Sequence, residues 1–130
     1  KNDKKAIILI TDGEENKSRY KWSELLEFCN ESDVQIYGIG LRGPEQYGHS
    51  TISRLIWLTG GRAFSGDFGN LAYYFDLINA ELRSQYLLSY VPTNTLPDKK
   101  WRRIRVKLDV PEGLPKLTIR ARQGYYASRH

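Results

Sequence analysis

The stretch that decides the fold is Ala6-Ile7-Ile8-Leu9-Ile10-Thr11, which Asp12-Gly13 ends. It is a continuous run of apolar, mostly β-branched residues without polar alternation, which is typical of a strand buried on both faces of a parallel sheet. We therefore expect a central strand here. Because parallel strands are joined by long crossovers, usually helical, the residues that follow should supply a helix and then another strand.

The next 70 or so residues alternate between helical and strand patterns. Apolar residues from Trp22 to Cys29 recur at the i, i+3, i+4 and i+7 positions of an amphipathic helix, with Cys29 as a small buried hydrophobe. The later elements are predicted as a strand at 34–40, a helix at about 52–59 that Gly60-Gly61 ends, a short strand at 62–65 and a helix at about 70–84. This order predicts an α/β unit with a parallel sheet over residues 1–84.

The pattern changes after residue 84. A strand is predicted at 86–91, and a loop rich in Thr, Asn, Pro and Lys follows. Residues 103–110 and 117–122 then alternate between apolar and polar side chains, with a turn at 111–115, which predicts an antiparallel β-sheet within residues 85–130. Four tyrosines are expected to pack at the junction of the two units: Tyr86, Tyr90, Tyr125 and Tyr126.

Composition narrows the class of protein. The chain has 130 residues, 40% apolar and 27% charged, which is the profile of one soluble globular domain, and its single Cys excludes an internal disulfide. No stretch approaches the roughly 18 apolar residues of a membrane span, and no signal peptide is visible in this chain, so no membrane insertion is predicted. The charge is uneven: residues 1–80 hold 9 Lys and Arg against 11 Asp and Glu, whereas residues 81–130 hold 11 against 4.

Three segments in order closely resemble the second half of a von Willebrand factor type A domain: ILITDGEEN (8–16), VQIYGIG (34–40) and LTGGRAF (58–64). The later segments RSQYLLSYVPTN (83–94) and RARQGYYA (120–127) look like the bacterial group of VWFA-related proteins. The resemblance implies a partial doubly wound, Rossmann-like parallel sheet at 1–84 and an appended antiparallel β-sheet at 85–130. It also implies a parent protein that is secreted, periplasmic or at the cell surface.

The resemblance further implies a metal-ion-dependent adhesion site at the carboxyl ends of the strands. In the family, an Asp-x-Ser-x-Ser loop, a Thr and a later Asp hold Mg²⁺ or Mn²⁺, and Asp12 matches that later Asp. This chain contains no Asp followed by x-Ser-x-Ser, and one carboxylate cannot supply the several oxygens that a hard dication needs. We therefore expect no cofactor in this chain alone, with Asp12 a ligand of Mg²⁺ or Mn²⁺ only in a complete parent domain.

The resemblance also points to a protein partner. In the family the strand that matches residues 6–11 pairs with the first strand, which has no counterpart here, so residues 6–11 should present an apolar edge. The partner could be a second copy of this chain, a swapped segment or a polypeptide that carries the missing half. The residues predicted to contact a partner are Glu14, Glu15, Arg103, Arg105, Arg120 and Arg122.

The resemblance, and the lack of a nucleophile paired with a base, predict a non-enzymatic protein–protein interaction or adhesion module. Two alternatives stay open. Asp12, Glu14 and Glu15 could serve a metal-assisted hydrolase, because carboxylates at the ends of parallel strands are placed for such chemistry. The basic face of the C-terminal hairpin could bind the phosphate backbone of nucleic acid, although no nucleic-acid-binding motif accompanies it.

Overall fold

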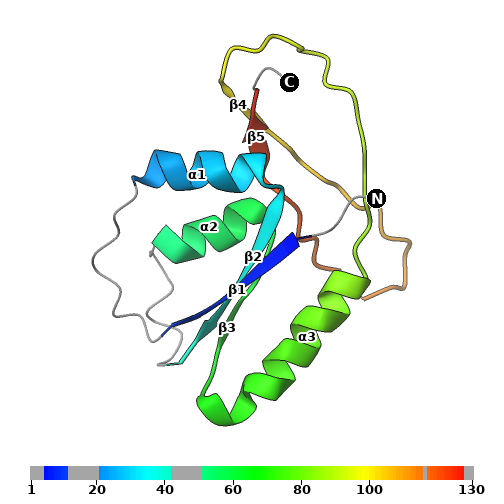
Figure 1. The fold of residues 1–130 in the computed structure, drawn as a ribbon. Coiled ribbons are helices and arrows are strands. Elements are labelled where there is room, and N and C mark those ends of the chain that lie inside the picture. The colour runs from blue at the N-terminus through cyan, green and yellow to red at the C-terminus, as the bar shows by residue number, and fades with distance from the viewer. Residues whose placement is uncertain (1–4, 12–20, 42–50, 116, 128–130) are drawn as a thin grey trace.

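The computed structural model describes residues 5–11, 21–41, 51–115 and 117–127 (Figure 1). The elements are β1 (Lys5–Thr11), α1 (Trp22–Glu31), β2 (Val34–Gly40), α2 (Thr51–Thr59), β3 (Ala63–Ser65), the 3-10 helix η2 (Phe68–Asn70), α3 (Leu71–Arg83), β4 (Trp101–Arg103) and β5 (Gly124–Tyr126). The fold is mixed α/β, with a three-stranded parallel sheet and a two-stranded antiparallel sheet. The prediction of an α/β unit followed by a small antiparallel sheet is confirmed at this level.

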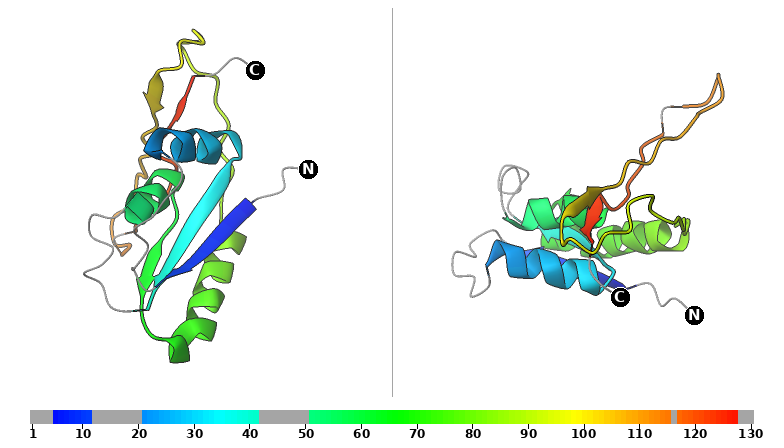
Figure 2. Two further views of the ribbon diagram at one scale, coloured as in Figure 1. Left: turned by 60° about the vertical axis from the view of Figure 1, so that its left-hand side comes forward. Right: turned by 90° about the horizontal axis from the view of Figure 1, so that it is seen from above.

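The parallel sheet has the strand order β1-β2-β3. β1 pairs with β2 along its whole length, and β3 pairs with the last three residues of β2. Helices α1 and α2 lie on one face of this sheet and α3 lies on the other (Figures 1 and 2). The sheet is therefore the middle layer of three.

Strand β1 is an edge strand among the described residues, so the central position predicted from its apolar run is wrong, whereas the apolar edge expected at residues 6–11 from the resemblance is found. Among the residues that the structure describes, β1 is paired only with β2. Ile7 and Ile10 are consequently 38% and 45% exposed. The apolar run fits a central strand, but a central position requires a second neighbour, which the described part of the chain does not provide.

Two apolar clusters hold the layers together. Because successive side chains of a strand point to opposite faces, Ile36 packs toward α1 and α2 while Tyr37 packs toward α3. The first cluster consists of Cys29, Val34, Ile36, Leu55 and Ile56, and the second of Tyr37, Ile39, Phe64 and Ile78. The expected burial of Cys29 is confirmed, since this residue is only 7% exposed.

The C-terminal end of α2 is fixed by local chemistry. Thr59 Oγ1 accepts a hydrogen bond from Ile36 N at 3.0 Å, which ties the helix to β2. Gly60 then takes a positive φ of 78°, a conformation that favours glycine, and Gly61 N donates to Ile56 O at 2.9 Å. A Cβ atom on Gly60 would lie 2.6 Å from the carbonyl carbon of Ala121, so glycine also lets the C-terminal segment approach closely.

The antiparallel unit is shorter than predicted. The ladder joins Trp101 to Tyr126 and Arg103 to Gly124, and no other residue of 86–91, 103–110 or 117–122 lies in a strand. The strand predicted at 86–91 is therefore wrong, and the two hairpin strands are wrong in extent. The turn is confirmed, because Leu114 N donates to Pro111 O at 3.4 Å. A long amphipathic hairpin needs a layer against its apolar face, and the hairpin between β4 and β5 instead projects from the helices and the sheet (Figure 2).

Candidate functional site

The carboxyl ends of the three parallel strands meet at one edge of the sheet, where ligands bind in open α/β sheets. Leu41 N donates to Thr11 O at 3.0 Å and Gly66 N donates to Gly40 O at 2.9 Å, so the chain segments that leave the strands begin side by side. The predicted site residues Asp12, Glu14 and Glu15 directly follow β1 and lie outside the described residues.

The described residues at this edge do not fit a Mg²⁺ or Mn²⁺ site. In the described part of the chain, no group of three or more His, Cys, Asp and Glu side chains could hold a metal ion. Asp67 follows β3, but its Oδ1 atom already accepts hydrogen bonds from Asn70 N at 3.1 Å and Asn70 Nδ2 at 2.9 Å. Because a hard dication needs several free oxygen ligands, Asp67 alone does not make such a site.

Among the described residues, β1 has the longest strand edge that pairs with no other strand. Its side chains alternate, so Ile7 shares a face with Leu9, toward α1 and α2, and Ile10 shares a face with Ile8, toward α3. Exposed apolar side chains therefore flank the unpaired backbone groups above and below. An edge of this kind is a template for another strand.

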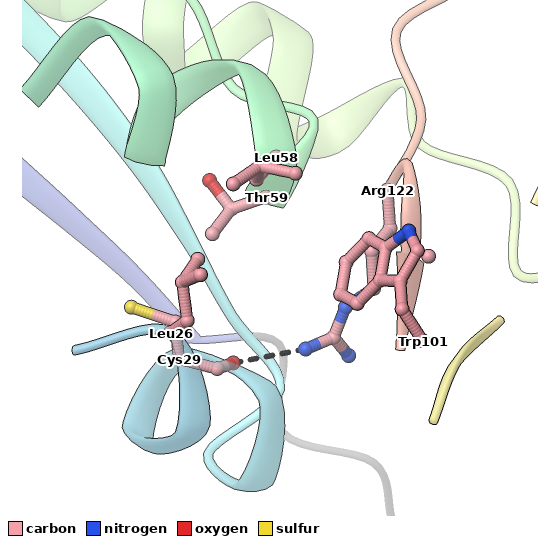
Figure 3. Close-up of a pocket in the computed structure, with 7 residues that line it drawn as sticks. Leu26, Cys29, Leu58, Thr59, Trp101 and Arg122 are labelled. Atoms are coloured by element: carbon pink, nitrogen blue, oxygen red, sulfur yellow. Dashed lines mark hydrogen bonds between the residues drawn. The ribbon is translucent and has the colours of Figure 1, made fainter. Parts of the chain in front are cut away.

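The four arginines predicted to contact a partner divide into two groups. Arg103, Arg105 and Arg120 are exposed. Arg122 instead points into the fold, where its Nη2 donates to Cys29 O at 2.9 Å and its Nη1 pairs with Asp33 Oδ1 at 2.9 Å. Figure 3 shows the first of these bonds. Arg122 thus joins the C-terminal sheet to the end of α1.

A small pocket lies beside this contact (Figure 3). It is lined by Leu26, Cys29, Leu58, Thr59, Trp101, Arg122 and Gly124. Its volume of about 10 Å³ leaves room for about one water molecule. Burial raises the pKa of the Cys29 thiol although the nearby Arg122 charge lowers it, so the sulfur stays protonated and is a poor nucleophile.

The C-terminal hairpin also meets the end of α3. Burial raises the pKa of the Tyr37 hydroxyl and the Glu81 charge raises it further, whereas a hydrogen bond with Gln85 and the charge of Arg120 lower it. Charged residues of α3 and of the hairpin therefore lie near enough to Tyr37 to act on its hydroxyl. The sequence pattern did not predict this proximity because Tyr37 and Arg120 are 83 residues apart.

The predicted tyrosine cluster is found only in part. The rings of Trp101 and Tyr126 are 5.0 Å apart and nearly perpendicular, which is a packed pair. Tyr90 shares a hydrogen bond with Tyr125, and the pKa of Tyr90 is raised by burial first and by this bond second. Tyr86 is 93% exposed, so it does not take part in the cluster.

Comparison with known proteins supports the fold alone. No protein-family model and no curated protein matches the chain. A solved structure matches it with a TM-score of 0.50 and 21% sequence identity, over 61% of this chain and 47% of the other: the crystal structure of an uncharacterized membrane-spanning protein from Vibrio fischeri. The present chain thus spans about half of that protein's length.

This match corrects the predicted location of the parent protein. We expected a secreted, periplasmic or cell-surface protein, whereas the solved protein with the matching fold is described as membrane-spanning. The expectation was wrong because it rested on family resemblance alone. None of the helices in the described residues is long and apolar enough to span a bilayer.

Proposed function

We propose that this chain is a non-enzymatic protein–protein interaction module that binds its partner through the free edge of β1. The observation that carries the proposal is a seven-residue strand that, within the described part of the chain, pairs with a strand on one side only, with Ile7 and Ile10 exposed on its two faces. Strand addition at such an edge satisfies the unpaired backbone groups and buries apolar side chains in one step.

The proposal includes the resemblance to the von Willebrand factor type A domain. Residues 1–84 would be the second half of such a domain, and residues 85–130 its C-terminal β extension. Three parallel strands in the order β1-β2-β3 between two helical layers support this assignment. In a complete parent domain, Asp12 would then help to hold Mg²⁺ or Mn²⁺.

The partner at the β1 edge should be an extended strand with apolar side chains on both faces. Any strand that pairs with β1 would lie between Ile7 on the side of α1 and Ile10 on the side of α3. A second copy of this chain offers such a strand, because its own β1 contains a single charged residue, Lys5, at one end. We therefore propose that two copies associate edge to edge when no other partner is present.

Light scattering of the purified chain over a range of concentrations tests this function. We expect concentration-dependent association that Ile10→Lys weakens at least about tenfold, since an inward charge blocks edge pairing. Trp57→Lys is the matched control, because Trp57 is an exposed apolar residue on α2, away from the edge. A chain that stays monomeric at every concentration, or equal effects of the two variants, would contradict the proposal.

A further inference from the structure

The backbone groups of β1 alternate between two directions. In an extended strand, the N–H and C=O of one residue point to the same side, and those of the next residue point to the other side. Leu41 N donates to Thr11 O at 3.0 Å, so the peptide groups of Thr11 and of the other odd-numbered residues of β1 face β2. The residues whose peptide groups face the free edge are Ala6, Ile8 and Ile10.

The far side of β2 supports this assignment. Gly38 N donates to Arg62 O at 3.0 Å and Gly40 O accepts from Gly66 N at 2.9 Å, so the even-numbered residues of β2 face β3 and its odd-numbered residues face β1. Thr11 lies opposite Gly40. A residue that bonds to the neighbouring parallel strand thus lies opposite a residue whose groups face away from it.

This rule excludes a symmetric parallel pair between two copies of β1. A two-fold axis along the strands would set Ile8 at the level of Ile8 of the second copy, with the peptide groups of both residues facing the junction. A parallel ladder requires one of the two opposed residues to face away. A parallel pair therefore needs a shift of one residue, which makes the two copies inequivalent, whereas most oligomers of identical chains are symmetric.

An antiparallel pair fits the same groups. In an antiparallel ladder, directly opposed residues can exchange both hydrogen bonds, so residues with outward groups lie opposite one another. A two-fold axis perpendicular to the sheet then sets Ile8 opposite Ile8 of the second copy, and Ala6 opposite Ile10. This register uses every outward group of both strands. A shift of two residues in either direction leaves Ala6 or Ile10 opposite a position outside β1.

The side chains fit this register as well. The opposed pairs are Ile10 with Ala6, Ile7 with Leu9, and Lys5 with Thr11. Because opposed residues of an antiparallel pair share a face, the exposed Ile10 lies beside the small Ala6. The two copies of Lys5 lie at opposite ends of the junction, roughly 20 Å apart, because six residues of extended chain separate them. The register therefore brings no like charges together.

We propose that two copies join β1 to β1 in antiparallel register about a two-fold axis between their Ile8 residues. Three strands from each copy then make one continuous six-stranded sheet. Because the axis is perpendicular to the sheet, both α3 helices lie on one face, and α1 and α2 of both copies lie on the other (Figure 2). The inference rests on the function proposed above and adds the geometry in which the partner binds.

Disulfide trapping with single-cysteine variants tests this register. Light scattering first establishes the concentration at which the copies associate, and oxidised glutathione is then added above it. The native Cys29 is only 7% exposed, so the parent chain should form no cross-link. Ile8→Cys should give a disulfide-linked dimer at least about tenfold faster than Trp57→Cys on the exposed surface of α2. The Cα atoms of an opposed, hydrogen-bonded pair lie about 5.5 Å apart, within the range of a disulfide.

Mixed variants separate this register from its neighbours. Ala6→Cys and Ile10→Cys should each cross-link slowly alone, because equivalent thiols lie four residues apart along the junction, and at least about tenfold faster when mixed. Both positions are exposed, so this test stands if Ile8→Cys fails to fold. Faster trapping of Ile8→Cys with Ala6→Cys or Ile10→Cys, or association without trapping, would overturn the register and leave the proposed function standing. A chain that stays monomeric would overturn both.

Discussion

The guanidinium of Arg122 joins the C-terminal sheet to the α/β unit, and its removal tests what holds the two together. Its bond to Cys29 O uses a carbonyl in the last turn of α1, where helices lack internal donors. The carboxylate of Asp33 is 89% exposed, so that ion pair is worth only about 0.2–1 kcal/mol. A bond from a charged donor is worth about 1.5–3 kcal/mol. We expect Arg122→Met to lower the free energy of unfolding by about 2–3 kcal/mol.

Urea unfolding followed by tryptophan fluorescence measures this change, provided that the slope of the free energy against urea is the same in both proteins. Asp33→Asn is the matched control, because it removes the ion pair and retains the bond to Cys29 O, and it should cost less than about 1 kcal/mol. If Asp33→Asn cost as much as Arg122→Met, or if Arg122→Met cost nothing measurable, the stabilisation could not come from the helix carbonyl.

Three further substitutions, two of them with a matched control, test the fold. Burial alone would raise the pKa of the Asp98 carboxyl, but hydrogen bonds and charges from Lys100 and Arg102 lower it below its ordinary value. The ionised carboxylate therefore stabilises the fold, and this stabilisation is lost as the pH falls through the lowered pKa. In Asp98→Asn, the free energy of unfolding should fall less steeply with decreasing pH than in the parent chain. Gly60→Ala should lower the free energy of unfolding, measured in urea, by more than about 1 kcal/mol. Gly113→Ala is the control: this glycine also has a positive φ but lies in open space, so its substitution should lower the free energy of unfolding by about 1 kcal/mol. In the same assay, Ile78→Ala should lower the free energy of unfolding by about 2–5 kcal/mol, because Ile78 is buried. Phe68 is exposed, so Phe68→Ala should lower it by less than about 0.5 kcal/mol.

The helices and the parallel strands were predictable because their patterns are local. The apolar spacing from Trp22 to Cys29 predicts α1, and the predicted helix at 70–84 matches α3 at Leu71–Arg83. Gly60-Gly61 marked the end of α2 correctly because the positive φ at Gly60 favours glycine. In each case the information that decides the structure lies within a few residues along the chain.

The misplaced features depend on partners distant in sequence. An apolar run is compatible with a central strand or an edge strand, so the run alone wrongly placed β1 in the centre, whereas the resemblance, which indicated a missing neighbour, correctly predicted an edge. The alternating pattern of residues 103–122 predicted that Arg122 is an exposed charge. Its side chain instead binds Cys29 and Asp33, which are 93 and 89 residues away in the sequence, so a local pattern could not predict these contacts. The predicted metal-site residue Asp12 lies outside the described residues.

The same sequence separation has a kinetic consequence for folding. Closing a loop of about 90 residues costs roughly 4 kcal/mol of chain entropy before any contact across it forms. The paired residues of β1 and β2 are 29 apart, so the α/β unit closes its loops at a lower cost of roughly 3 kcal/mol, and the contacts of Arg122 should form after the main barrier to folding has been crossed. Loss of Arg122 should then speed unfolding and leave the folding rate almost unchanged. The contacts of the C-terminal sheet would thus form late in folding and set the unfolding rate of the α/β unit.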